Sequence, residues 1–84
     1  MYTKNQFNRL KLAKRYEVLT EEGRFVASRF FESFNVHLFA MDGFYVEMWQ
    51  RISMNQVVYI EVVNNDETLK LYIDNIDLKK DLGL

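Results

Sequence analysis

The stretch NVHLFAMDGFYVEMWQR (residues 35–51) decides the fold of this chain. Aromatic and β-branched residues fill both of its halves, and Asp42-Gly43 separates them. Asp-Gly between two such runs is the strongest short-range signal of a β-hairpin, since a type I′ turn needs positive φ at both central residues. The stretch therefore predicts two antiparallel strands joined by a two-residue loop.

A two-residue loop also fixes which side chains share a face of the hairpin. It places Phe39 opposite Val46 and His37 opposite Met48, and directly opposite residues lie on the same face. This face carries no formal charge, and we predict it to be the core face. The other face, here called the mixed face, alternates apolar, aromatic and charged side chains: Val36, Leu38, Ala40, Tyr45, Glu47, Trp49 and Arg51.

A third run, VVYIEVV (residues 57–63), extends the hairpin into a meander. Its purely apolar side is formed by Val58, Ile60 and Val62. This side meets the core face only if the connecting loop has an odd number of residues, because a shift of one residue moves every side chain to the other face. We therefore expect the loop Ser53-Met54-Asn55, with Asn55 in the left-handed conformation.

The segments outside the meander predict one further strand and two helices. Residues 24–31 (RFVASRFF) are expected to form a strand that turns at Glu32-Ser33, although a continued helix is an alternative there. Residues 3–20 have the apolar periodicity of a helix, and Gly23 is a plausible stop. Residues 66–76 follow an asparagine cap and also have helical periodicity, with apolar positions Leu69, Tyr72, Ile73 and Ile76.

The predicted fold is thus α+β, a four-stranded antiparallel β-meander flanked by N-terminal and C-terminal helices within a single domain, residues 1–84. On the N-terminal helix, one broad side holds Leu10, Leu12, Ala13, Tyr16 and Leu19. We expect one core in which sheet residues pack against residues of both helices. The sheet residues are Phe39, Val46, Met48, Val58, Ile60 and Val62, and the helix residues are Leu12, Tyr16, Leu69 and Ile73.

The composition is that of a small folded domain without thiol chemistry. The 84 residues are 49% hydrophobic, carry a net charge of −1 and include no cysteine, which excludes disulfides and cysteine ligands. The start MYTKNQ lacks the apolar core of a signal peptide, and no apolar run reaches the about 18 residues of a membrane span. A cytoplasmic location, without membrane contact and without a cofactor, is the expectation.

The mixed face is the most informative candidate for function. If both helices cover the core face, an aromatic patch stays exposed, and such patches are commonly binding sites on soluble proteins. If one helix packs on each face, the patch is buried instead. The leading interpretation is a protein–protein interaction module, a homodimer in its most concrete form, that associates through a strand edge or through Tyr45, Glu47, Trp49, Arg51, Tyr59 and Glu61.

Glu47 and Glu61 also support a different class of function. The expected register makes them neighbours on the mixed face, beside aromatic residues. Paired carboxylates near aromatic rings occur in glycosidases and in some metal sites. A ligand-binding or hydrolytic pocket is therefore an alternative, although an enzyme is not the leading interpretation, and a solvated polar strand face explains the same two residues.

The basic N-terminal third suggests nucleic acid as another possible partner. Residues 1–30 hold seven Lys or Arg and three Glu, whereas residues 61–84 hold three Lys and six acids. Four of these basic residues project from the expected helix and could bind phosphates: Lys4, Lys11, Lys14 and Arg15. A pI of about 5.8 argues against this alternative, and a solvated helix face is the simpler interpretation.

The remaining polar residues show no catalytic or metal-binding pattern. His37 is the only histidine, and the spacing assigns no serine or acid to it. The acids of the C-terminal third lack the glycine that a calcium loop requires. We therefore interpret His37 as a structural residue at the rim of the core face, and we expect no metal site.

Overall fold

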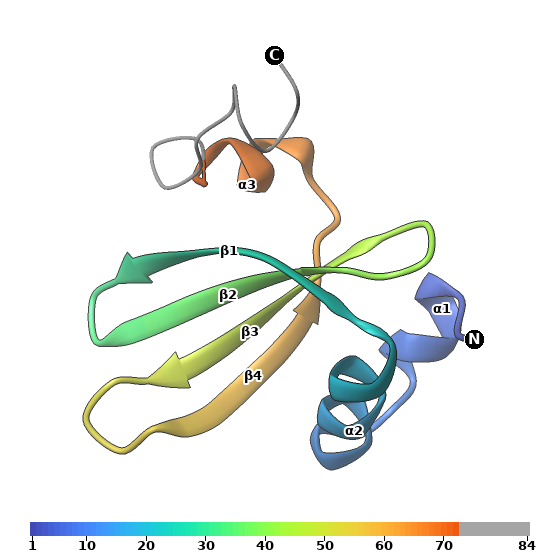
Figure 1. The fold of residues 1–84 in the computed structure, drawn as a ribbon, viewed down its shortest axis with the longest axis horizontal. Coiled ribbons are helices and arrows are strands. Elements are labelled where there is room, and N and C mark those ends of the chain that lie inside the picture. The colour runs from blue at the N-terminus through green and yellow to red at the C-terminus, as the bar shows by residue number, and fades with distance from the viewer. Residues whose placement is uncertain (73–84) are drawn as a thin grey trace.

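A computed structural model describes residues 1–72, and Figure 1 shows their arrangement. The elements in chain order are α1 (Lys4–Asn8), α2 (Leu12–Glu22), β1 (Arg24–Phe31), β2 (Phe34–Ala40), β3 (Tyr45–Arg51), β4 (Gln56–Val62) and α3 (Asp66–Lys70). The strands form one antiparallel sheet in the order β1-β2-β3-β4. The α+β class, the meander and the strand at residues 24–31 are confirmed, whereas the predicted helical positions Ile73 and Ile76 lie outside the described residues.

The prediction of one continuous helix over residues 3–20 is wrong, because the chain forms two helices there. Thr3 begins α1 with a capping box: Thr3 Oγ1 accepts from the Gln6 N–H at 3.2 Å, and Gln6 Oε1 accepts from the Thr3 N–H at 2.9 Å. The helix ends after Asn8, and α2 starts beyond Lys11, whose backbone is extended. The two helices therefore have separate axes.

Arg15 explains the break between α1 and α2. Its guanidinium group donates to the carbonyl oxygens of Asn8 at 2.7 Å and Leu10 at 2.8 Å. In a continuous α-helix those carbonyls would accept from backbone N–H groups four residues further on. The side chain of Arg15 therefore satisfies acceptors that the interrupted helix leaves without a backbone partner.

Gly23 marks the end of α2, as expected. Glycine is needed at this position because of close packing, and not because of an unusual backbone angle. Its φ is −79°, which other residues adopt readily. However, a Cβ atom at this position would lie 2.6 Å from the carbonyl oxygen of Leu19. The chain can leave α2 along this path only because residue 23 has no side chain.

The hairpin of β2 and β3 has the predicted register but a different turn. Phe39 pairs with Val46 and His37 with Met48, as the sequence predicted. Of the two central residues, only Gly43 has a positive φ, at 89°. The type I′ prediction is therefore wrong, since that turn also requires a positive φ at Asp42.

The connection from β3 to β4 preserves the predicted faces by another route. Arg51 pairs with Gln56, so four residues rather than three form the loop, with Asn55 in the expected left-handed conformation at φ 51°. A register shift follows between Trp49 and Gln50, where β4 contains one extra residue. Beyond this β-bulge, the expected pairs form: Trp49 with Tyr59, Met48 with Ile60, Glu47 with Glu61 and Val46 with Val62.

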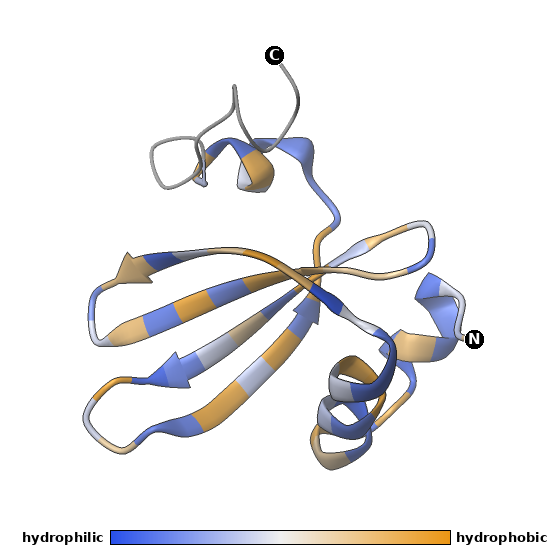
Figure 2. Cartoon of the chain, in the orientation of Figure 1, coloured by the Kyte–Doolittle hydropathy of each residue, from blue (hydrophilic) through white to orange (hydrophobic). Residues whose placement is uncertain are grey.

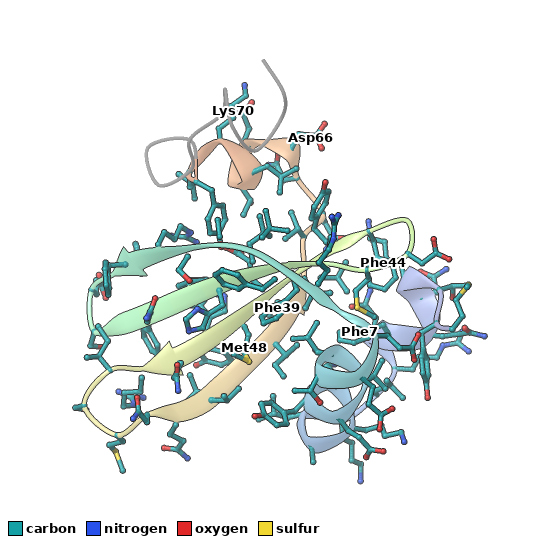
Figure 3. The ribbon with its side chains drawn as sticks, viewed as in Figure 1. Phe7, Phe39, Phe44, Met48, Asp66 and Lys70 are labelled. Carbon is teal, nitrogen blue, oxygen red and sulfur yellow. The ribbon has the colours of Figure 1, made fainter. Side chains whose placement is uncertain are left out.

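Helices α1 and α2 cover the core face of the sheet. The buried residues there are Phe7, Val18, Leu19, Phe44, Val46, Ile60 and Val62, and Phe39, Met48 and Val57 pack against them. Figure 3 shows Phe39 and Met48 on the sheet, and Phe7 and Phe44 beside α1. Leu12 and Tyr16 are 41% and 47% exposed, so their predicted core role is wrong. Helix α2 buries Val18 and Leu19 near its C-terminal end, whereas Leu12 and Tyr16 line an open depression on the surface.

Part of the mixed face carries a second, smaller core. Ala27, Leu38 and Tyr72 are buried together, with Val63 and Leu69 packed against them. Leu69 therefore lies apart from the core face, contrary to the prediction, and α3 lies away from α1 and α2 (Figure 1). The alternation of apolar and polar residues along the strands is visible in Figure 2 and matches this two-sided burial.

Candidate functional site

The mixed face has a buried ion pair at its centre. Arg29 Nη2 of β1 donates to Glu47 Oε2 of β3 at 3.0 Å, diagonally across β2. The Tyr72 hydroxyl, which follows α3, donates to the same oxygen at 2.5 Å. A solvated strand face was one explanation for Glu47, but its side chain is only 9% exposed, so that explanation is wrong for this residue.

The environment of Tyr72 changes the acidity of its phenol. The residue is fully buried, and its hydroxyl donates to the Glu47 carboxyl group. Burial is the main cause that raises the pKa of Tyr72, and the hydrogen bond to Glu47 raises it further, because both disfavour the phenolate. Tyr72 therefore remains a donor to Glu47 over the whole neutral pH range.

Trp49 is the centre of an aromatic cluster at the other end of the mixed face. Its ring lies 5.6 Å from Phe34, 5.8 Å from Phe31 and 6.5 Å from Tyr59, each pair in an edge-to-face arrangement. The Arg29 guanidinium lies 5.4 Å from the centre of the same ring. Trp49 is consequently half-buried, whereas the interface prediction required substantial exposure.

The other predicted interface residues take different positions around this cluster. Tyr59 is exposed and belongs to the cluster, and Arg51 stacks over Phe34 at 5.3 Å. Tyr45 is exposed at the opposite end of β3, beside the Asp42-Gly43 turn. Trp49, Tyr59 and Arg51 therefore lie close together in the structure, whereas Tyr45 lies apart from them.

A shallow depression of about 320 Å³ brings together the two glutamates singled out by the sequence. Phe34, Glu47, Trp49, Tyr59 and Glu61 line it. Glu61 pairs directly with Glu47 in the sheet register and keeps 59% of its side chain exposed. Its carboxylate lies 3.8 Å from Arg15 Nη1.

Arg15 does not belong to an exposed basic stripe. Besides its two bonds at the break between α1 and α2, it donates to the carbonyl of Ile60 in β4 at 2.6 Å and stacks over Phe7. Lys4 and Lys11 are exposed, and Lys14 is exposed but bonds to Glu17 at 3.2 Å. The predicted group of four phosphate-binding side chains is thus reduced to three lysines.

His37 belongs to a hydrogen-bonded chain that crosses three strands. Ser28 Oγ lies 2.7 Å from His37 Nδ1, and His37 Nε2 lies 3.1 Å from Gln50 Oε1. The amide of Gln50 donates to the carbonyl of Asn55, so its oxygen faces His37 and accepts from Nε2–H. Nδ1 therefore accepts from the Ser28 hydroxyl. These side-chain hydrogen bonds connect strands β1, β2 and β3.

The two edges of the sheet are protected to different degrees. On the β4 edge, Arg15 Nη1 donates a hydrogen bond to the carbonyl oxygen of Ile60. Within the part of the chain that the structure describes, backbone hydrogen bonds reach β1 only from β2. The β1 strand also exposes four apolar side chains: Phe25, Val26, Phe30 and Phe31.

Sequence reasoning missed Ser28, Arg29, Phe31 and Phe34 as partners of the candidate residues. The available signal was the Glu32-Ser33 turn, which pairs Phe31 with Phe34 and therefore Ser28 with His37. Applying the two-residue rule to this first hairpin would have found both pairs. Tyr72 had no comparable signal, because its contact with Glu47 depends on the path of the chain after β4.

Comparison of this chain with protein-family models, with curated proteins and with solved structures finds no match. Among residues 1–72, no helix is long and apolar enough to cross a membrane. The same residues contain no group of three His, Cys, Asp or Glu side chains that could hold a metal ion.

Proposed function

We propose that this protein is a protein–protein interaction module that self-associates through the edge of β1. The observation that carries the proposal is that, within residues 1–72, β1 has a strand edge without a backbone partner and exposed aromatic side chains. An open edge presents backbone donors and acceptors that a second strand can pair with. Antiparallel pairing of β1 with β1 of a second copy would join two four-stranded sheets into one.

The apolar side chains of β1 support this pairing. Phe25 and Phe30 lie on the core-face side of the strand, and Phe31 lies on the mixed-face side, so both sides of a joined sheet would gain aromatic contacts. Phe30 is 77% exposed, and the exposure of so much apolar surface to water is unfavourable in a monomer. A two-fold pair would bury such side chains against their own copies.

The contrast with β4 explains why β1 is the preferred edge. Natural sheets protect their edges with charged side chains and with covering elements. Arg15 does both at β4, since its guanidinium binds the Ile60 carbonyl and its helix lies beside the strand. At β1, a bulge between Phe25 and Ala27 distorts only the first part of the strand, and residues 27–31 pair regularly with β2.

The other interpretations from the sequence have less support. Association through the mixed face is less favoured because Tyr72 and Leu69 already cover one part of that face. Nucleic-acid binding is less favoured because Arg15, one of its four predicted residues, donates its hydrogen bonds to backbone carbonyls. A homodimer in the cytoplasm remains the expectation.

Light scattering after size-exclusion chromatography tests the proposal, with the mass measured over a range of protein concentrations. The parent protein should approach twice the mass of one 10.1 kDa chain. Phe30→Lys places a charge beside the edge and should yield a folded monomer with retained strand content by circular dichroism. Met54→Lys is the matched control, because Met54 is 68% exposed in the β3–β4 loop, and it should leave the dimer intact. A parent that remains monomeric at the highest concentration would contradict the proposal.

A further inference from the structure

We infer that two copies of β1 pair about a two-fold axis that passes between their Arg29 residues. This inference rests on the proposed self-association and names the register in which the second copy binds. The pairing places Ser28 of each copy directly opposite the partner's Phe30. The evidence comes from the direction of the backbone groups of β1 and from the two irregular positions that limit its edge.

The hydrogen bonds at the two ends of β2 show which of its backbone groups point toward β3. The N–H of Ile52 donates to the carbonyl of Ser33 at 2.9 Å. The N–H of Met41 donates to the carbonyl of Phe44 at 2.8 Å, and the register between these two points is regular. Successive residues of an antiparallel strand direct their backbone groups to opposite sides. The odd-numbered residues of β2 therefore bond to β3, and the even-numbered residues bond to β1.

This alternation leaves two residues in the regular part of β1 with outward backbone groups. The even-numbered residues of β2 pair with Ala27, Arg29 and Phe31, whose N–H and C=O groups therefore point toward β2. The N–H and C=O groups of Ser28 and Phe30 point to the open edge instead. Within residues 1–72, none of these four groups has a backbone partner. The edge thus offers two donors and two acceptors to a second strand.

One two-fold register uses all four groups within the regular part of the strand. When Ser28 lies opposite the partner's Phe30, the two copies exchange four backbone hydrogen bonds. When Ser28 lies opposite the partner's Ser28, Phe30 meets Val26, where the β-bulge interrupts the strand. When Phe30 lies opposite the partner's Phe30, Ser28 meets Glu32, which lies in the turn with φ 52°. Each of these two registers keeps only two of the four regular hydrogen bonds, so the first is favoured.

The orientation of Arg29 is compatible with an axis at this residue. Like charges directly opposite each other across two strands are normally destabilising. The guanidinium of Arg29, however, extends across β2 to Glu47 of β3, where Nη2 and Oε2 lie 3.0 Å apart. The two guanidinium groups of a dimer would therefore point away from each other, each toward its own carboxylate.

The exposed phenylalanines meet small side chains in the same register. Phe30, which is 77% exposed, lies beside the partner's Ser28 on the core-face side. Phe31, which is 46% exposed, lies beside the partner's Ala27 on the mixed-face side. A small neighbour leaves room for each ring to lie against the partner strand, which removes aromatic surface from water.

Disulfide trapping tests the register, because the chain has no cysteine of its own. Ser28→Cys and Phe30→Cys are prepared separately, mixed at a concentration at which the parent is dimeric, and oxidised. The mixture should give a linked heterodimer by mass spectrometry, since the Cα atoms of a hydrogen-bonded pair lie about 5.5 Å apart. Either variant alone should stay unlinked, because equal residues are then offset by two positions and exceed the about 7 Å limit of a disulfide.

A second mixture keeps Phe30 in both chains. Ala27→Cys and Phe31→Cys should also form a heterodimer, because these residues form a non-hydrogen-bonded pair with Cα atoms about 4.5 Å apart. Met54→Cys is the control, since it places an exposed thiol in the β3–β4 loop and should link to none of the other variants.

The linkage pattern and the mass of the parent give separate answers. A linked dimer from Ser28→Cys alone or from Phe30→Cys alone would overturn the inference, because it would place the axis at that residue. A dimeric parent with both mixtures unlinked would also overturn it. In these cases self-association itself would stand, whereas a parent that is monomeric at every concentration would refute the proposed function and the register together.

Discussion

Arg29 and Glu47 form a buried ion pair that joins the edge strand β1 to the central strand β3, with Nη2 and Oε2 3.0 Å apart. Arg29 also lies over the rings of Phe31, Trp49 and Tyr72. The pair therefore links the aromatic cluster to the buried contact of Tyr72. The edge strand, the sheet centre and the chain after α3 meet in this interaction.

Removing one partner of this pair should destabilise the protein strongly. Glu47→Ala leaves the guanidinium of Arg29 buried without a counter-charge, and we expect a loss of about 3–5 kcal/mol in the free energy of unfolding. The double variant Arg29→Met with Glu47→Met should lose much less, because it buries no charge. Urea denaturation followed by circular dichroism measures both. A loss under about 1 kcal/mol for Glu47→Ala would show that the pair is not buried in solution.

Arg15 should matter for stability although it was expected on an exposed basic face. Arg15→Gln removes charged hydrogen bonds to three carbonyls, and we expect a loss of about 2–3 kcal/mol. Lys11→Gln is the matched control, since Lys11 is an exposed base on the same segment and should change stability by less than about 0.5 kcal/mol. Thermal and urea unfolding of the two variants should therefore differ clearly, and equal values would contradict the assigned role of Arg15.

The meander was predictable because its information is local. Turn residues and alternating side chains within residues 35–63 set the register from Phe39 with Val46 to Glu47 with Glu61. The parity argument held although a bulge accompanies a four-residue loop, because burial of Ile60 specifies the face more strongly than the loop specifies its length.

The N-terminal helices were not predictable in the same way, because their break depends on a distant contact. Arg15 binds Ile60, a residue 45 positions away in the sequence. The bulge has a similar non-local origin and places Val57, rather than the expected Val58, against the core. On the mixed face, the burial of Glu47 depends on Arg29 and Tyr72, which lie on different elements.

The turn at Glu32 offers a stabilising substitution. Glu32 has φ 52°, a conformation that costs a residue with a side chain about 1–2 kcal/mol. Glu32→Gly relieves this cost but increases the entropy of the unfolded chain, so we expect a net gain of about 0.5 kcal/mol. Glu32→Val should instead lose more than about 1 kcal/mol. Asn55→Gly is the comparison at φ 51°, where asparagine already tolerates the conformation and the change should be small. The melting temperatures of the three variants test this ranking, which a destabilised Glu32→Gly would contradict.

Tyr72 should make the stability of the protein depend on alkaline pH. Burial and Glu47 raise its pKa in the folded state, whereas the unfolded chain keeps a value near 10. The phenol therefore loses its proton first in the unfolded chain, so its contribution to stability is complete below about pH 10 and declines as the pH rises further. Between the two pKa values, the slope for one proton is about 1.4 kcal/mol per pH unit.

Tyr72→Phe isolates this effect, because phenylalanine keeps the buried ring and removes the titrating hydroxyl. At neutral pH the variant should be less stable by about 1–2 kcal/mol, since Glu47 loses one donor but keeps Arg29. Urea denaturation at several values between pH 8.5 and about 11 should then show a steeper loss for the parent than for the variant. Lysines and the other tyrosines titrate in both proteins, so they cancel in this comparison. Parallel curves above pH 10 would mean that the hydroxyl of Tyr72 is accessible to solvent and is not held against Glu47.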